Sequence, residues 1–184
     1  MSEAKLNKNL YVEVGPSGRA VSQSIEENLL SNLYQHLTME RNANVQYFSM
    51  SLWFKERDLN GFSSYFLRES KDEMDHAIKF SNYLIARGQT VELEDLSAPL
   101  SKWNSIEELI SYSFKMESDL TTSIQQLYSL SERSSDVRTN VFLDPFIEAQ
   151  VKSEDEFANL LGRVKFSENQ PSALLIIDDS LYKK

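Results

Sequence analysis

The chain has 184 residues, with 28 acidic side chains against 19 basic ones and no cysteine. The length predicts a single domain, and the lack of cysteine excludes disulfides, thiolate metal sites and cysteine nucleophiles. A net charge of −9 argues against nucleic acid as a partner, because such binding depends on Lys and Arg neutralising phosphates, but it does not argue against cations.

Helical periodicity dominates the chain, and no segment alternates convincingly like a strand. An irregular N-terminal tail is expected over residues 1–24. A first helix is predicted over residues 25–57. A second is predicted over residues 61–87, with Gly88 as its C-terminal stop.

The second half of the chain repeats this organisation. A third helix is predicted to begin at residue 104 or 105 and to end near residue 133, and Ser105 and Glu108 form the capping-box pattern at its start. A fourth helix is predicted over residues 139–166, and a short fifth helix follows Pro171. The longest apolar run lies in that last helix and is too short to span a membrane. With no secretory signal visible, we expect a cytoplasmic protein with no membrane partner.

The lengths of the connections predict the topology. Short breaks join the first helix to the second and the third to the fourth, so each pair is expected to be antiparallel. The connection over residues 88–103 can extend about 50 Å, at about 3.3 Å per residue. That exceeds the length of a 27-residue helix, about 40 Å. We therefore predict an all-α four-helix bundle over residues 25–166, with one long crossover and a short fifth helix within the C-terminal segment, residues 167–184.

Ionisable side chains interrupt the apolar faces of three predicted helices. Glu40 lies in the apolar stripe of the first helix, Glu69, Glu73 and His76 lie in that of the second, and Glu117 lies in that of the third. A buried carboxylate without a partner is strongly unfavourable. The apolar face of the fourth helix carries the uncharged polar residues Gln150 and Ser153. Four helices that each place a polar group about halfway along an apolar face are expected to bring these groups together, where bound cations would neutralise the carboxylates.

The spacing within the second helix points to a pair of metal ions. Glu73 and His76 present an oxygen and a nitrogen ligand one turn apart, the i, i+3 spacing of di-iron carboxylate bundles. Glu40 would complete one metal position, Glu117 the other, and Glu73 could bridge them. Carboxylates with one imidazole suit iron or manganese better than a structural zinc. The alternative is that this Glu-x-x-His pattern is solvated surface.

Other polar residues have ordinary interpretations beside functional ones. Tyr47 lies two turns from Glu40 on the same face, where it is either core or a redox-active phenol. His36, one turn before Glu40, is interpreted as a hydrogen-bonded or surface histidine rather than a ligand. The acidic run over residues 154–156 fits a solvated helix face.

At these residues the chain resembles a non-haem ferritin, specifically one of the cyanobacterial type among bacterial ferritins. The resemblance covers nearly the whole chain. The matching segments are Met39–Arg41, Tyr47, Lys71–Ala77, Phe114–Glu117, Val141–Pro145, Leu160–Phe166 and Ala173–Asp178.

The resemblance implies a ferroxidase centre that holds two iron ions per subunit. Glu40 and His76 would hold one iron, Glu73 would bridge, and Glu117 would hold the second. It also implies that Gln150 lies near the second iron and that Tyr47 lies beside the centre. Further metal-binding candidates are Glu69 and Asp72 as accessory carboxylates, Asp144 in the three-fold channels, and Glu148 and Glu154, which stay open because Pro145 is expected to distort the fourth helix.

The implied function is iron storage and detoxification. Fe(II) would be oxidised by dioxygen and stored as an Fe(III) mineral in a homo-oligomeric shell of 24 subunits, with the fifth helix at the four-fold axis. The fourth helix departs from bacterioferritin by carrying Gln150 and Ser153, and from three-iron ferritins by carrying Ala149 and Lys152. Two alternatives remain open: a di-iron peroxidase or oxygenase of small oligomeric size, and a metal-free helical interaction module.

Overall fold

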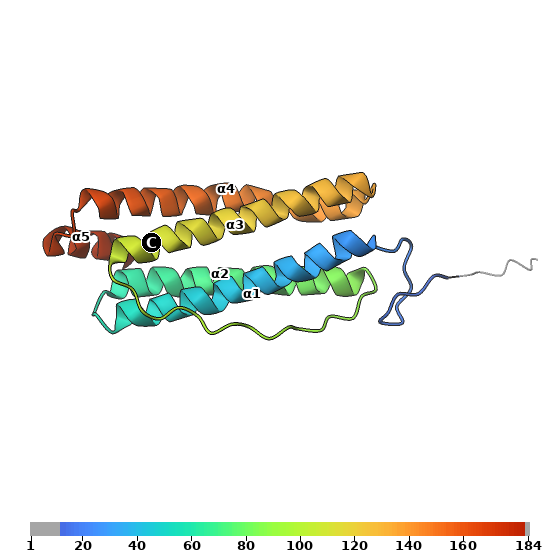
Figure 1. Ribbon diagram of the computed structural model, residues 1–184, viewed down its shortest axis with the longest axis horizontal. Helices are drawn as coiled ribbons and strands as arrows, with labels where there is room; N and C mark the ends of the chain where they lie inside the picture. Colours follow the sequence, from blue (N-terminus) through green and yellow to red (C-terminus); the bar gives the residue numbers. More distant parts are fainter. Residues whose placement is uncertain (1–11, 183–184) are drawn as a thin grey trace, which may run out of the picture.

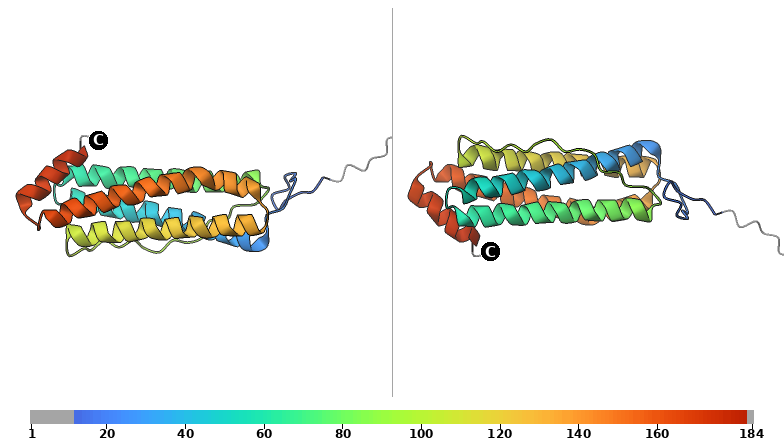
Figure 2. Two further views of the ribbon diagram at one scale, coloured as in Figure 1. Left: turned by 90° about the horizontal axis from the view of Figure 1, so that it is seen from above. Right: turned by 90° about the horizontal axis from the view of Figure 1, so that it is seen from below.

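The computed structural model describes residues 12–182, which form a four-helix bundle with a shorter helix across one end (Figures 1 and 2). The predicted fold class is confirmed, and the four long helices begin and end within two residues of their predicted bounds. Residues 1–11 of the expected tail and residues 183–184 of the C-terminal segment lie outside the described residues. The helices are α1 (Glu27–Lys55), α2 (Asn60–Ala86), α3 (Ile106–Arg133), α4 (Val137–Phe166) and α5 (Pro171–Tyr182).

The helix ends follow local sequence signals. Gly88, at φ +81°, takes the left-handed conformation just after α2, where glycine is favoured. The Ser105 hydroxyl accepts from the Glu108 amide at 3.0 Å, as the capping box predicts, but the Glu108 carboxylate accepts from the Asn104 amide and not from that of Ser105. Pro145 lies inside α4, which is helical on both sides of it, so the expected distortion does not interrupt the helix.

The long crossover between α2 and α3 runs along α1 (Figure 1). Near its start, the Tyr34 hydroxyl donates to the carbonyl oxygen of Thr90 at 2.8 Å. Near its end, the Gln46 side chain donates to the Leu100 carbonyl at 3.0 Å and accepts from the Leu100 amide at 2.9 Å. The contacts therefore advance in the same direction along α1 and along the crossover, and they return the chain to the end of the bundle where α3 begins.

The apolar core is divided into two clusters along the bundle. One, the α5-side cluster, includes Phe54, Phe66, Phe157 and residues of α5. The other, the distal cluster, includes Phe80 and Phe146. Both clusters draw residues from all four long helices. Buried Glu40, Glu73 and Gln150 each lie, along their helix, between members of the two clusters. Among residues 12–182, no helix combines the length and the apolar character needed to cross a membrane.

Helix α5 is fixed on the N-terminus of α2. The Asp178 carboxylate accepts a hydrogen bond from the Phe62 amide at 2.8 Å, which satisfies one of the free amides at the start of α2. Gly61 allows this close approach, because a Cβ at that position would lie 1.8 Å from the Asp178 carbonyl oxygen.

Substitution Gly61→Ala is expected to loosen α5 specifically. The added methyl group must displace the Asp178 backbone, at a cost of about 1–3 kcal/mol. Hydrogen exchange should become faster in α5 while amides in the middle of α3 keep their protection. Gly162→Ala is the matched control, since a Cβ there has nothing within 4 Å. Unchanged exchange in α5 of the Gly61 variant would contradict the described contact.

Candidate metal centre

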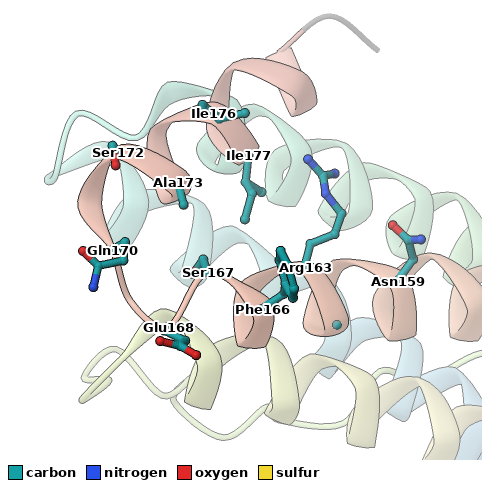
Figure 3. A pocket seen from close by; sticks show the side chains of 11 residues that line it. Asn159, Arg163, Phe166, Ser167, Glu168, Gln170, Ser172, Ala173, Ile176 and Ile177 are labelled. Atoms are coloured by element: carbon teal, nitrogen blue, oxygen red, sulfur yellow. The ribbon is translucent and has the colours of Figure 1, made fainter.

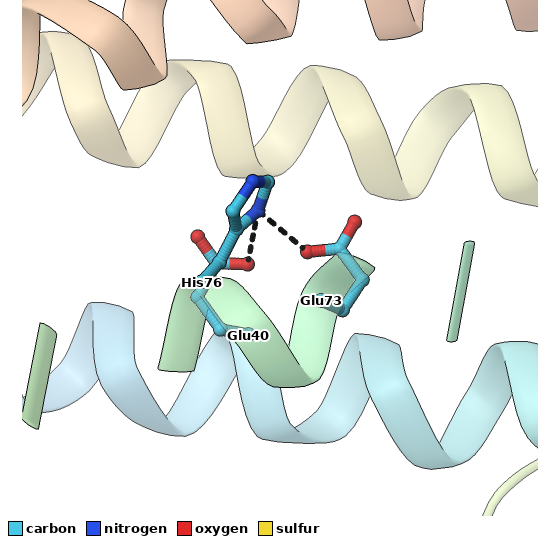
Figure 4. A group of neighbouring side chains, drawn as sticks. All are labelled: Glu40, Glu73 and His76. Atoms are coloured by element: carbon cyan, nitrogen blue, oxygen red, sulfur yellow. Dashed lines mark hydrogen bonds and ion pairs between the residues drawn. The ribbon is translucent and has the colours of Figure 1, made fainter. Parts of the chain in front are cut away.

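Three predicted ligands meet between α1 and α2. Glu40 comes from α1, while Glu73 and His76 come from successive turns of α2, and one ligand atom of each lies within 4.8 Å of the others (Figure 4). His76 Nδ1 lies 3.2 Å from Glu73 Oε2 and 3.6 Å from Glu40 Oε2. The two glutamates are buried, at 2% and 4% exposure, and His76 is half-buried. Both carboxylates therefore face one imidazole nitrogen inside the bundle.

One oxygen of this group lacks a hydrogen-bond partner. Glu40 Oε2 is buried and accepts no hydrogen bond from the described part of the chain. An uncompensated carboxylate oxygen inside a protein is costly. A cation held between Glu40, Glu73 and His76 would satisfy this oxygen, and two carboxylates with one imidazole are a donor set that suits iron or manganese.

Glu117 faces this group from α3 and is held on both of its oxygens. The Tyr47 hydroxyl donates to Glu117 Oε1. The Gln150 side-chain nitrogen donates to Glu117 Oε2 at 3.2 Å and to Thr121 Oγ1 at 3.2 Å. Glu117 is 1% exposed. Gln150 therefore contacts Glu117, the carboxylate predicted to hold the second metal.

The buried carboxylates strongly affect one another's protonation. Burial, and then the neighbouring charges of Glu40 and Glu117, raise the pKa of Glu73 well above its usual value. Burial also raises the pKa of Glu117, although hydrogen bonds from Tyr47 and Gln150 oppose this. For Glu40, burial alone would raise the pKa, but the hydrogen bond from His36 and the nearby His76 imidazole outweigh it and hold the pKa low. Glu73 and Glu117 therefore keep their protons to a higher pH than an ordinary glutamate, and a bound cation would displace those protons.

The further metal-binding candidates lie in different environments. Glu69 is half-buried one turn before Glu73, and burial, followed by the charges of Glu117 and Asp72, raises its pKa to about 8. Asp72 and Glu148 are exposed, and Glu154 is half-buried. The exposed carboxylate of Asp144 accepts a hydrogen bond from the Tyr128 hydroxyl near the start of α4. None of these residues belongs to the group around His76.

His36 and Ser123 are polar neighbours of the centre whose pairing the sequence did not predict. His36 is fully buried, and its Nε2 lies 2.8 Å from Glu40 Oε1. Its Nδ1 lies 2.9 Å from the Ser123 hydroxyl of α3. The four-residue spacing to Glu40 agrees with the hydrogen-bonded interpretation of His36. Ser123 gave no signal, because it lies 87 positions along the chain from His36.

The chain is similar to known proteins both in its sequence and in its structure. A family profile described as a ferritin-like domain matches residues 30–167. The chain is 31% identical to Ferritin-1 heavy chain of Schistosoma mansoni over 147 residues, covering 76% of this chain and 85% of that protein. It is 27% identical to the bacterial non-heme ferritin of Staphylococcus aureus over 157 residues, covering 85% and 95%. An open-pore ferritin from Archaeoglobus fulgidus superposes with a TM-score of 0.85 at 25% identity, covering 88% of this chain and 99% of that one.

Proposed function

The chain belongs to the ferritin-like domain family, and we propose that it oxidises Fe(II) at a di-iron centre inside each subunit and stores the Fe(III) product as a mineral in a shell of 24 subunits. The observation that carries this proposal is the buried group of Glu40, Glu73 and His76 with Glu117 facing it. A bundle core holds so many carboxylates only when protons or cations compensate them. The names of the similar proteins, which include a ferritin heavy chain and a bacterial non-heme ferritin, agree with iron as the cation.

The proposed centre has two iron positions with different ligands. In this proposal Glu40 and His76 hold one Fe(II), Glu117 holds the second, and Glu73 bridges the two. Each iron gives one electron to dioxygen, which takes up two protons to form hydrogen peroxide. Carboxylate oxygens are hard donors that favour Fe(III) over Fe(II), and their negative charge stabilises the higher oxidation state.

Tyr47 and Gln150 support the second position. Both donate hydrogen bonds to Glu117, one on each oxygen, and so fix the plane of its carboxylate. Outer hydrogen bonds of this kind orient metal ligands and tune their basicity. Half-buried Glu69 lies one turn before Glu73, and we propose that it passes Fe(II) towards the centre.

The surface around α5 supports assembly into a closed shell. A groove of about 770 Å³ lies between the end of α4 and α5, with Phe166, Ala173 and Ile176 among its lining residues (Figure 3). Phe166 is 91% exposed and Ile176 is 70% exposed in the single chain. Exposed apolar side chains clustered in this way mark an interaction surface. We propose that neighbouring subunits cover it, that residues 25–166 form the di-iron domain, and that α5 lies at the four-fold axis.

Two measurements on the wild-type protein test the proposal. Anaerobic titration with Fe(II) should show two ions bound per chain, and rapid mixing with dioxygen should give a fast absorbance rise from Fe(III). Analytical ultracentrifugation should give a particle of 24 chains of 21.2 kDa each, which sediments faster after iron loading. A dimer or tetramer that turns over Fe(II) without retaining mineral would favour the peroxidase or oxygenase alternative. Failure to bind Fe(II) would favour the metal-free helical module.

A further inference from the structure

We propose that His36 is a positioning residue that turns Glu40 into a single-oxygen metal ligand and ties that ligand to α3. The proposal rests on the metal centre proposed above and adds a residue outside its ligand set. It follows from the partners of the two nitrogens of the His36 ring and from the state of the two oxygens of Glu40.

The ring of His36 is fixed at both nitrogens. Nε2 lies 2.8 Å from Glu40 Oε1 and Nδ1 lies 2.9 Å from Ser123 Oγ. A carboxylate only accepts hydrogen bonds, so Nε2 must carry the proton that it shares with Glu40. The ring is fully buried and packs against Phe80, with 4.5 Å between the ring centroids. His36 therefore has one well-defined orientation.

This hydrogen bond divides the roles of the two Glu40 oxygens. Oε1 accepts a hydrogen bond from His36, whereas Oε2 accepts none from any residue between 12 and 182 and lies 3.6 Å from His76 Nδ1. Oε2 is the Glu40 oxygen that lies near His76 Nδ1, so a metal held by these two residues would bind through Oε2, while the hydrogen bond from His36 holds Oε1 in place. A single-oxygen contact leaves more of the coordination sphere free for dioxygen and for release of the product than a two-oxygen contact would.

Ser123 extends this arrangement to the second helical hairpin. Its hydroxyl joins α3 to α1 through His36, and the Tyr47–Glu117 hydrogen bond joins the same two helices again. The two ties lie on α1 on opposite sides of Glu40, four residues before it and seven after it. These two hydrogen bonds between α1 and α3 therefore fix the distance between Glu40 and Glu117. They also fix the distance between the two proposed metal positions.

Co(II) binding to the metal-free protein tests this role without oxidation chemistry. We expect His36→Leu to weaken Co(II) binding at the centre by about 10–100-fold, the usual effect of losing an outer hydrogen bond to a ligand. We also expect weaker visible absorption per bound Co(II), because Glu40 becomes free to bind through both oxygens and Co(II) absorption falls as its coordination number rises. His36→Gln should restore part of both properties, since its amide can donate to Glu40. Ser123→Ala should change both in the direction of His36→Leu, whereas Ser129→Ala, an exposed serine of α3, should leave both unchanged.

The outcomes separate this role from its rivals. Wild-type affinity and absorption in His36→Leu would overturn the proposal. So would equal defects in the Leu and Gln variants, which would indicate packing or direct metal ligation. If His36→Leu does not fold, Ser123→Ala decides, and wild-type behaviour there would overturn the proposal. Wild-type protein whose Co(II) binding is absent or unaffected by Glu73→Gln would show that the metal centre itself is wrong, and the role of His36 would fall with it.

Discussion

Glu73→Gln is expected to abolish the fast phase of Fe(II) oxidation while leaving the bundle folded. Glu73 is the carboxylate proposed to touch both iron positions, so its loss should weaken both. Removal of an outer hydrogen bond at a metal site already costs about 10–100-fold, and loss of the bridging ligand should reduce the initial rate by at least about 100-fold. Stopped-flow absorbance after mixing Fe(II)-loaded protein with oxygenated buffer measures the effect.

The Glu73→Gln substitution removes a proposed metal ligand while keeping the size and shape of the side chain. Glutamine, like the protonated Glu73 of the metal-free protein, carries no charge, so the metal-free variant should be about as stable as the metal-free wild type. Glu132→Gln makes the same change at an exposed position near the end of α3 and should oxidise Fe(II) at the wild-type rate. Equal fast phases in the Glu73 variant and the wild type would mean that oxidation takes place elsewhere.

The metal-free protein is expected to lose stability as the pH rises from 5 towards 8.5. The pKa of Glu69 is about 8 in the folded protein, against an ordinary value of 4.5. Between these values the folded chain holds a proton that the unfolded chain releases, so the free energy of unfolding falls as pH rises. Glu73, whose pKa is also raised, acts in the same direction. The combined loss is on the order of a few kcal/mol and is complete once the pH exceeds the folded-state pKa.

Thermal unfolding of metal-free protein across this pH range measures the effect. The midpoint should fall by several degrees, since about 1 kcal/mol corresponds to about 2–4 °C in a chain of this size. Glu69→Gln should flatten part of the decline, whereas Glu132→Gln should follow the wild type. Added Co(II) should reduce the decline by replacing protons with a cation. Parallel curves for the Glu69 variant and the wild type would show that Glu69 titrates normally.

The helices and their order were predictable because the chain marks its breaks clearly. Glycine and proline are scarce, and Gly88 and Ser105 stand at helix ends. The long connection between them could only be assigned a length from sequence. Its path depends on contacts such as Gln46 with Leu100, which join positions 54 residues apart and have no local pattern.

The centre was predictable to the level of which residues share a face. Glu40, Glu73 and His76 were expected to converge, and the structure brings them together. The direction of an amide was not predictable: Gln150 lies at the centre, but its nitrogen is directed to Glu117. Periodicity also fixes a helical position only to within part of a turn. Glu148 was left open as a ligand because Pro145 was expected to distort the fourth helix, but α4 continues through Pro145 and exposes Glu148.

The division of the apolar core into two clusters leaves most of the proposed metal ligands outside the apolar contacts that hold the helices together. The α5-side cluster and the distal cluster each take side chains from every long helix. Glu40, Glu73 and Gln150 belong to neither cluster, so a substitution at one of them removes no member of either. A bundle built in this way can exchange one ligand set for another over evolution, or lose it, without passing through an unfolded ancestor.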